Sequence, residues 1–371
     1  MSSSSNPETT AIEYKCVNTI RTLSMDAVQK ANSGHSGTPM ALAPVAHVLY
    51  TRILRHDPKN PNWFNRDRFV LSAGHASMLL YSTLHLSGYD ISLEDIKEFR
   101  QWGSKTPGHP EVHHTPGVEV TTGPLGQGFA NAVGMAMAEE YLRATCGKDV
   151  IDHNIFVLCS DGDLMEGISY EAASIAGHNK LSKLIAIYDD NKITIDGSTD
   201  LTFSENVADR FRAQGWNVIE AGEISEDLDA IESAINQAKQ NNDAPTIIII
   251  RSHIGYPSPQ FTDTSAAHGA LTNGEDLLAT KSIMQMSEEP FFVDEDVRDF
   301  YSNKGERFSA ESKSWTDQSK NNPLLASILD GTNESVAQLV QQDLANYFMD
   351  SSGEVIAPNP GDEIATRVSC G

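Results

Sequence analysis

Two apolar segments of the chain end in short polar motifs whose side chains suit hard cations. The run NIFVLCS leads into Asp161-Gly162, and the run LIAIYDD leads into Asn191. Asp161 offers a carboxylate oxygen and Asn191 an amide oxygen, while Mg²⁺ takes few protein ligands and completes its shell with phosphate oxygens. Gly162 has no side chain, so its backbone N–H can approach a phosphate closely. These residues indicate a metal–diphosphate site, although Asp-Gly and Asp-Asn are also ordinary turn pairs.

The segments around these motifs alternate between strand and helix patterns. Four runs rich in β-branched residues are apolar nearly throughout, as in strands buried on both faces of a parallel sheet: 154–160, 184–190, 216–222 and 246–252. Helical patterns occupy 11–55 (two helices separated by SGHSGTPM), 128–143, 166–180, 206–214 and 228–240. We therefore expect an α/β fold with a doubly wound, mostly parallel sheet and helices on both faces. Both polar motifs then lie at the carboxyl ends of strands, where such sheets bind ligands.

Histidines beside glycines recur in the predicted loops. They are His35 in SGHSGTP, His75 in SAGHAS, His109 in TPGHPE and His268 in AAHGA. A lone histidine is more often structural, but histidine can also hydrogen-bond phosphates or sugar hydroxyls and transfer protons near neutral pH. Four such units favour a functional reading, and their spacing is not that of a zinc site.

Two further loops have simpler interpretations beside the functional one. The glycine-rich loop GPLGQG (123–128) precedes a helix, and by itself it is better explained by a turn followed by tight helix packing. His113 and His114 are interpreted as surface residues.

Composition and charge exclude several classes of protein. The 27 basic and 51 acidic side chains give a net charge of -24, which argues against nucleic-acid or anionic-membrane partners. The four cysteines are widely scattered, which suits a reducing compartment, and we expect a cytoplasmic protein. Residues 1–10 lack the features of a targeting peptide and are expected to form a disordered tail.

Longer motifs carry a family resemblance. The Ser160-Asp161-Gly162 triplet, followed after 27 residues by Asp190-Asn191, is similar to the thiamin-diphosphate motif, with Ser160 and Asp190 as departures from its usual Gly and Asn. The segments EGISYEAASIAGH, YDDNKITIDG, FNRDRFVLSAGHAS, KTPGHPEV and GVEVTTGPLGQG closely resemble transketolase. The resemblance runs through residues 11–270, fades over 271–360 and returns at ATR (365–367).

The resemblance implies a domain plan and an incomplete site. Residues 11–320 would form the diphosphate-binding domain, 321–362 a connector, and 363–371 the start of a pyrimidine-binding domain that is otherwise absent. In the family that second domain carries the glutamate that activates the cofactor. The chain is therefore interpreted as a subunit of a split enzyme, a truncated product or a degenerate paralogue.

The resemblance also implies roles for individual residues. The metal, Mg²⁺ or Ca²⁺, would be bound by Asp161, Asn191 and the backbone carbonyl of Ile193. Thiamin diphosphate would be held by His75, Gly123, Pro124, Leu125, Gly162, Asn191 and His268. The implied catalytic residues are His35, His109 and His268, and the implied substrate ligands are His35, Arg100, His268 and Arg367. Glu166 and Glu171 would join an acidic network across a dimer interface.

The activity implied is transfer of a two-carbon ketol unit from a ketose phosphate, xylulose 5-phosphate, to an aldose phosphate such as ribose 5-phosphate or erythrose 4-phosphate in the pentose phosphate pathway. The expected partners are sugar phosphates and either a second copy of the chain or a C-terminal transketolase half. Two alternatives stay open, namely an enzyme similar to dihydroxyacetone synthase and a non-catalytic binding protein derived from the domain. A nicotinamide-dependent enzyme is disfavoured, because no GxGxxG follows an early strand.

Overall fold

The computed structural model describes residues 7–270, 273–320, 322, 325 and 326. The chain divides into two compact units, residues 1–315 and residues 316–371. Apart from residues 322, 325 and 326, the expected connector at 321–362 lies outside the described residues, and so do the segment 363–371 and its Arg367. The architecture below is that of the first unit.

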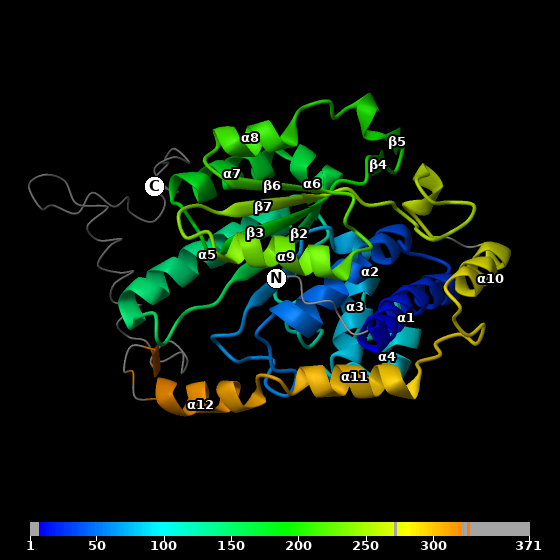
Figure 1. Cartoon of the computed structure of the whole chain (residues 1–371), viewed down its shortest axis with the longest axis horizontal. Helices are drawn as coiled ribbons and strands as arrows, with labels where there is room; N and C mark the ends of the chain where they lie inside the picture. The colour runs from blue at the N-terminus through cyan, green and yellow to red at the C-terminus, as the bar shows by residue number, and fades with distance from the viewer. Residues whose placement is uncertain (1–6, 271–272, 321, 323–324, 327–371) are drawn as a thin grey trace, which may run out of the picture. The chain divides into compact units, whose positions relative to one another are not determined.

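A five-stranded parallel sheet forms the centre of this unit (Figure 1). Its strands lie in the order β1 (Arg68–Leu71), β2 (Ile155–Ser160), β3 (Leu184–Asp189), β7 (Thr246–Ile250) and β6 (Asn217–Gly222). Ser160 at the end of β2 is in register with Asp189 at the end of β3, so the two polar motifs emerge side by side. A separate antiparallel pair, β4 (Ile193–Thr194) and β5 (Gly197–Ser198), follows β3. The expected doubly wound, mostly parallel α/β fold is confirmed.

Helices cover both faces of the sheet because successive strand residues point to opposite sides. On β2, Val157 and Cys159 pack with α5 (Gln127–Cys146), α7 (Gly167–His178) and α8 (Val207–Ala213). Phe156 and Leu158 pack on the other face with α1 (Pro7–Ala31), α2 (Gly37–Val48), α3 (Ser77–Leu86) and α9 (Leu228–Lys239). Figure 1 shows α7 and α8 on one side of the strands and α9 on the other.

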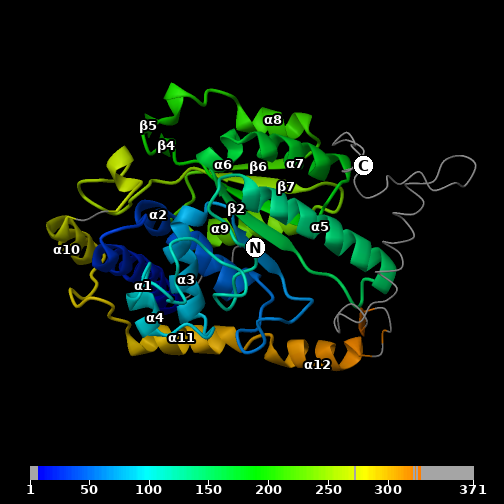
Figure 2. The ribbon, with the colours of Figure 1, turned by 180° about the vertical axis from the view of Figure 1, so that it is seen from behind.

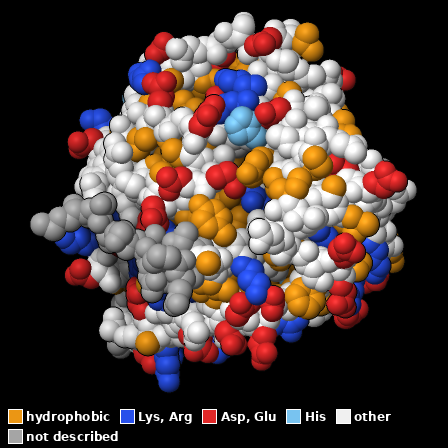
Figure 3. Space-filling model, turned by 45° about the vertical axis from the view of Figure 1, so that its right-hand side comes forward, with side chains coloured by type: hydrophobic (Ala, Val, Ile, Leu, Met, Phe, Trp, Pro, Cys, Tyr) orange, Lys and Arg blue, Asp and Glu red, His pale blue; other side chains and the backbone are white. Residues whose placement is uncertain are grey.

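The remaining elements connect these layers, and Figure 2 shows several of them from behind. They are η1 (Leu49–Ile53), η2 (Gly74–Ala76), α4 (Leu93–Lys97), α6 (Asp161–Met165), η3 (Thr199–Leu201), η4 (Ser265–Ala267), α10 (Gly274–Ile283), α11 (Glu295–Gly305) and α12 (Ser309–Ser319). Within the described part of the chain, no helix combines the length and the apolar character needed to cross a membrane. On the face drawn in Figure 3, basic side chains are dispersed among acidic and apolar ones, in keeping with the net charge of -24.

Three features differ from the sequence-based expectations. The run 216–222 forms β6 at the edge of the sheet, where its residues are half-buried or exposed and not covered on both faces. The opposite edge strand, β1, was not predicted, because it is only four residues long and its sequence pattern is correspondingly short. Helix α1 begins at Pro7, inside the expected tail, since proline is well suited to the first position of a helix.

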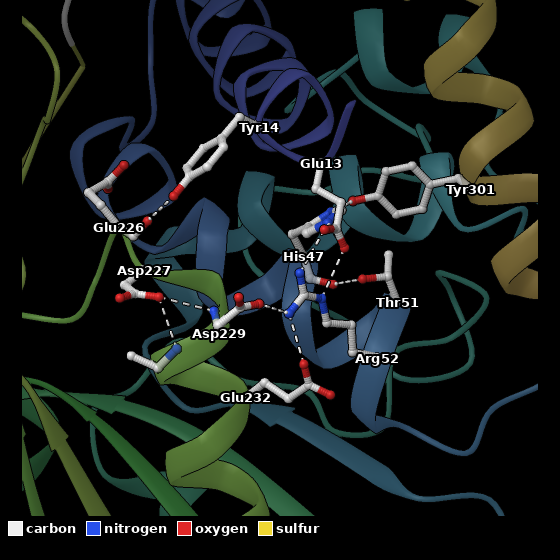
Figure 4. A network of polar contacts seen from close by, with 11 residues as sticks. Glu13, Tyr14, His47, Thr51, Arg52, Glu226, Asp227, Asp229, Glu232 and Tyr301 are labelled. Atoms are coloured by element: carbon white, nitrogen blue, oxygen red, sulfur yellow. Dashed lines mark hydrogen bonds and ion pairs between the residues drawn. The ribbon is translucent and has the colours of Figure 1, made fainter. Parts of the chain in front are cut away.

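A polar network on the α1 side of the sheet ties five helical segments together, namely α1, α2, η1, α9 and α11 (Figure 4). The guanidinium of Arg52 donates two parallel hydrogen bonds to the carboxylate of Glu13, at 2.9 and 2.6 Å. It also donates to Asp229 and Glu232 on α9, each at 2.8 Å. The arrangement therefore anchors α1 and η1 to α9 through a half-buried cation.

The second part of this network is a fully buried histidine. His47 on α2 has its Nδ1 2.9 Å from the hydroxyl of Tyr301 on α11 and its Nε2 3.7 Å from Glu13. Burial lowers the pKa of His47, so the imidazole is neutral near pH 7. The network lies away from the pocket described below and has a structural role.

Candidate functional site

The carboxyl edge of the sheet gathers chemistry-bearing residues from four strands. After β1 the chain turns into η2, which carries His75. Strand β2 leads to Asp161 at the start of α6, and β3 leads to Asn191. The segment after β7 reaches η4 and then His268. The sheet therefore places these residues at the edge where the sequence predicted a ligand site.

These residues line one pocket with a volume of about 400 Å³. This is the size of a typical small-molecule site. Its lining residues are His35, Thr38, His75, His109, Gly123, Leu125, Ser160, Asp161, Gly162, Met165, Asn191, Ile193, Thr194, Ile195 and His268. All four loop histidines and the three proposed metal-ligand residues thus share a single cavity.

Asp161 is buried and is only half satisfied by its surroundings. Its Oδ1 accepts a hydrogen bond from the hydroxyl of Tyr188 at 2.5 Å, whereas its Oδ2 has no hydrogen-bond partner among the described residues. Burial raises the pKa of Asp161 to about 7, and the nearby carboxylates of Asp189 and Asp190 add to this shift. An orphaned, buried carboxylate oxygen on a residue that lines a pocket is an arrangement that a cation would stabilise.

Asn191 is held in one orientation by its neighbours. Its Nδ2 donates to Oδ2 of Asp189 at 2.8 Å, and its Oδ1 accepts from the backbone N–H of Ile193 at 2.9 Å. Because a carboxylate only accepts hydrogen bonds, Asp189 selects the amide nitrogen of Asn191 and turns the amide oxygen the other way. Asp189 itself accepts a hydrogen bond from the hydroxyl of Ser252, a residue that follows β7.

The donor set fits a hard cation. Asp161, Asn191 and Ile193 line the same pocket and could offer a carboxylate, an amide oxygen and a backbone carbonyl, which are oxygen ligands of the kind that Mg²⁺ or Ca²⁺ prefers. In the part of the chain that the structure describes, no group of three or more His, Cys, Asp or Glu side chains could hold a metal. With so few protein donors, a bound ion would need further oxygens, such as those of a diphosphate.

Three of the histidines form a cluster. The ring centroids of His35 and His75 are 5.0 Å apart, those of His35 and His268 are 5.4 Å apart, and those of His75 and His268 are 5.1 Å apart. Burial lowers the pKa of His35 to about 4 and that of His75 to about 3, and it also lowers the pKa of His109 and His268. At pH 7 the cluster is therefore neutral, and each ring can both donate and accept a hydrogen bond.

Close backbone packing brings His268 to His35. A side chain on Gly37 would place its Cβ 2.1 Å from the carbonyl oxygen of Ala267, so only glycine fits at the start of α2. The backbone N–H of Gly255 donates to the carbonyl of Gly37 at 3.0 Å, which holds the same two segments together. The contact between Gly37 and Ala267 positions both histidines, because His35 lies two residues before Gly37 and His268 directly follows Ala267.

Asp163 organises the loops of the site, although the sequence analysis did not single it out. Its Oδ1 accepts from the hydroxyl of Ser72 at 2.7 Å and from the N–H of Gly126 at 2.8 Å, and its Oδ2 accepts from the N–H of Ser160 at 2.9 Å. One fully buried carboxylate thus joins the loops after β1 and β2 to the glycine-rich loop. The pattern Ser160-x-x-Asp163 is a capping-box signal, and it was the feature that could have revealed this residue.

Some predicted site residues lie outside the pocket. The guanidinium of Arg100 donates to the hydroxyl of Ser33 at 2.8 Å and lines an adjoining hollow of about 730 Å³. His109 lines both cavities, so the two adjoin at that residue. Pro124 does not line the main pocket. The following predicted residues are exposed: His113, His114, Glu166 and Glu171.

Comparison with known proteins identifies the relatives of this chain. A sequence model of the family described as transketolase, thiamine diphosphate binding domain, matches residues 12–334. The transketolase of Geobacillus stearothermophilus is 55% identical over 291 residues, which are 77% of this chain and 43% of that protein. The transketolase of Halalkalibacterium halodurans is 48% identical over 369 residues, which are 97% of this chain and 54% of that protein.

Solved structures give the same result. A transketolase from Pichia stipitis, in complex with sedoheptulose-7-phosphate, superposes with a TM-score of 0.83 at 44% identity and covers 86% of this chain and 48% of that one. The transketolase of Campylobacter jejuni has a TM-score of 0.82 at 46% identity, with 86% and 50% covered.

The matched region includes every element that contributes to the pocket, and this chain spans about half the length of the transketolases that it matches. The cofactors expected from the sequence, thiamin diphosphate with a divalent cation, are those of the family. The chain belongs to the transketolase family, and what it carries is the family's thiamine diphosphate binding domain.

Proposed function

We propose that this chain supplies the diphosphate-binding half of a transketolase active site. The observation that carries the proposal is the orphaned Oδ2 of Asp161, which is buried at the carboxyl edge of the sheet beside Asn191. The unpaired oxygen, the neighbouring amide and the glycine backbone lie in one pocket of suitable size. Together they fit a divalent cation bound to a diphosphate better than they fit an uncharged ligand.

We assign the metal ligands to Asp161, Asn191 and the backbone carbonyl of Ile193. Thiamin diphosphate would lie against His75, Gly162 and His268, with Gly123, Pro124 and Leu125 as the loop beside it. Gly162 suits this role because it lines the pocket without a side chain, and a methyl group added to it would lie only 3.0 Å from Leu125. When bound, thiamin diphosphate supplies the nucleophile and the electron sink for moving a two-carbon ketol unit.

The histidines would handle the sugar hydroxyls. His35, His109 and His268 are neutral at pH 7, because burial lowers the pKa of each, so each can accept a hydroxyl proton with one ring nitrogen while the other donates a hydrogen bond. Nδ1 of His35 is buried and has no hydrogen-bond partner among the described residues. A polar substrate atom in the pocket would satisfy it.

The phosphate end of the sugar would reach toward Arg100. Its guanidinium lies in the adjoining hollow, beyond His109, and its buried Nε has no hydrogen-bond partner within the described chain. A guanidinium suits a phosphate because it can donate two parallel hydrogen bonds. We propose that Arg367, which lies outside the described residues, is the second cation for the same group.

The proposed activity is transfer of a ketol unit from xylulose 5-phosphate to ribose 5-phosphate or erythrose 4-phosphate, in the cytoplasmic pentose phosphate pathway. The chain spans about half the length of its relatives. We propose that it works with a pyrimidine-domain partner. The proposed assembly is either a homodimer of this chain or a complex with a C-terminal transketolase half. Glu166 and Glu171 are exposed and would then be available to such a partner.

The test is a ketol-transfer assay with xylulose 5-phosphate, ribose 5-phosphate, Mg²⁺ and thiamin diphosphate. The chain is assayed alone, and with whatever C-terminal transketolase chain co-purifies from the native host. We expect activity only in the mixture, and we expect Asp161→Ala to abolish both the activity and the cation-dependent binding of the cofactor. Robust transfer by the chain alone would contradict the need for a partner. Unchanged cofactor affinity in the Asp161→Ala variant would contradict the site assignment.

A further inference from the structure

We infer that Tyr188 is a positioning residue for the metal site and that its hydroxyl fixes the carboxylate of Asp161 in the orientation that a divalent cation needs. The inference rests on the proposed function, because it concerns the same site. It assigns a role to a residue of the apolar core that neither touches the pocket nor resembles a metal ligand.

The geometry is specific to one oxygen of the carboxylate. The phenol hydroxyl of Tyr188 donates to Oδ1 of Asp161 at 2.5 Å, and Oδ2 of the same group is left without a hydrogen-bond partner among the described residues. Fixing one oxygen also fixes the plane of the carboxylate, so the other oxygen keeps one direction. Outer contacts of this kind orient metal ligands and tune their affinity.

The carboxylate of Asp190 is a second possible acceptor for the Tyr188 hydroxyl, but it already forms an ion pair with Lys192. Oδ1 of Asp190 is 3.1 Å from the phenol oxygen, but it also lies 2.6 Å from the ammonium of Lys192. A phenol has a single proton and can donate it to only one carboxylate at a time. The shorter contact and the ion pair on Asp190 both favour donation to Asp161.

A neutral donor suits this position better than a cation would. A lysine or arginine in contact with Asp161 would bring a positive charge that repels the divalent ion. The phenol orients the carboxylate and leaves its negative charge available to the metal. Its ring packs in the core formed by β2, β3, α5 and α7, so the hydroxyl is held in place from behind.

The hydroxyl can be removed while the ring is kept. We expect Tyr188→Phe to weaken binding of Mn²⁺ by the chain of residues 1–371 about 10- to 100-fold, which is the usual effect of losing such a contact. Binding is measured from the electron paramagnetic resonance signal of free Mn²⁺ at saturating thiamin diphosphate. Excess cation should restore cofactor binding, because the ligands themselves remain.

Tyr301→Phe is the matched control. Tyr301 is also fully buried, and its hydroxyl likewise has a buried hydrogen-bond partner, His47, in the network of Figure 4. We expect both variants to lose thermal stability but only Tyr188→Phe to lose Mn²⁺ affinity. Equal Mn²⁺ affinity in Tyr188→Phe and the wild type would overturn the inference.

A second measurement needs no variant of Tyr188. In the wild-type chain with ¹³Cζ-labelled tyrosine, saturation with Mg²⁺ and thiamin diphosphate should shift the resonance of a buried tyrosine, and no such shift should occur in Asp161→Ala. The absence of any shifted tyrosine in the wild type would contradict the inference.

The proposed metal site and the proposed role of Tyr188 can also fail separately. If Asp161→Ala binds Mn²⁺ normally, the metal site itself is wrong, whereas loss in Asp161→Ala with none in Tyr188→Phe refutes only the role of Tyr188.

Discussion

The imidazole ring of His35 lies edge to face with that of His268, and the two ring centroids are 5.4 Å apart. His35 precedes α2 near the start of the chain, whereas His268 follows η4 after the last strand of the sheet. Both rings line the pocket that also contains Asp161 and Asn191. The cluster therefore combines residues that only the folded chain brings together.

Replacing either histidine should reduce turnover more than stability. In an enzyme assembled from this chain and a partner that supplies the pyrimidine-binding domain, we expect His35→Ala and His268→Ala each to lower the turnover number. The expected loss is about 10²- to 10⁴-fold, since proton transfer is lost. Steady-state kinetics give the turnover number, and thermal unfolding reports the stability of the same preparations. His113→Ala, an exposed histidine outside the pocket, is the control. If the His35 and His268 variants melt early but keep their activity per folded molecule, they are packing residues.

The buried carboxylate of Glu13 should stabilise the fold above pH 4.5. Burial by itself would raise its pKa, but the nearby His47 and the two hydrogen bonds from Arg52 outweigh burial and lower the pKa to about 2. Because this value lies below the ordinary one, the ionised form stabilises the folded chain at neutral pH, and that contribution is lost as the pH falls from 4.5 to 2. We expect Glu13→Gln to cost about 3 kcal/mol at pH 7.

Urea unfolding at pH 7 and pH 3 measures this difference. The loss of unfolding free energy in Glu13→Gln should be smaller at pH 3 than at pH 7. Glu306→Gln removes one partner of an exposed ion pair with Lys59 and should change little at either pH. A pH-independent loss in Glu13→Gln would show that the hydrogen-bond geometry matters and the charge does not.

Glu139 on α5 should have the opposite effect on stability. Burial raises its pKa to about 7, the guanidinium of Arg143 lies 3.3 Å from its carboxylate, and neither carboxylate oxygen has a hydrogen-bond partner among the described residues. The folded chain therefore prefers the protonated form, and its stability falls as the pH rises from 4.5 to 7. We expect Glu139→Gln to remove this penalty and to raise the unfolding free energy by about 3 kcal/mol at pH 8. Denaturant unfolding at pH 8 and pH 4.5 checks this, and a gain of the same size at both pH values would contradict it.

Gly37→Ala should disturb the site through the backbone. The added methyl group would lie 2.1 Å from the carbonyl oxygen of Ala267, which must move and take His268 with it. We expect a loss of about 1–3 kcal/mol in stability, as for other overpacked positions, together with weaker binding of thiamin diphosphate. Calorimetric titration and thermal unfolding measure the two effects. Gly134→Ala on α5, where the methyl group would meet nothing within 4 Å, should be neutral or stabilising.

Most of the sheet could be predicted from residue patterns. Strands β2, β3 and β7 are buried along nearly all their length, and their continuous apolar runs reflect this. The run that forms β6 looked similar, but a strand at the edge of the sheet has a neighbour on one side only, and local sequence does not encode that order. Strand β1 is too short to be distinguished from the loops around it.

The position of the pocket could be predicted where residues with suitable ligand atoms directly follow predicted strands. Asp161 and Asn191 follow β2 and β3, so the parallel sheet necessarily brings them to one edge. The roles of Tyr188 and Asp163 depend on hydrogen bonds between segments, and composition and spacing do not reveal such contacts. The guanidinium of Arg100 contacts Ser33 in a neighbouring hollow, a placement that only the loop conformation determines, and its role at the substrate stays a prediction.

The close packing of Ala267 on Gly37 connects two segments that are far apart in the sequence. During translation, the segment with Gly37 is synthesised well before the segment with Ala267. Roughly 230 residues separate them, which at about 5–20 residues per second corresponds to some 10 to 50 seconds of synthesis. A nascent chain that ends before Ile254 has His35, His75 and His109 but lacks both Ile254 and Ala267, which pack on Gly37. We therefore expect affinity for the cofactor to be acquired late during translation, after β7 has joined the sheet.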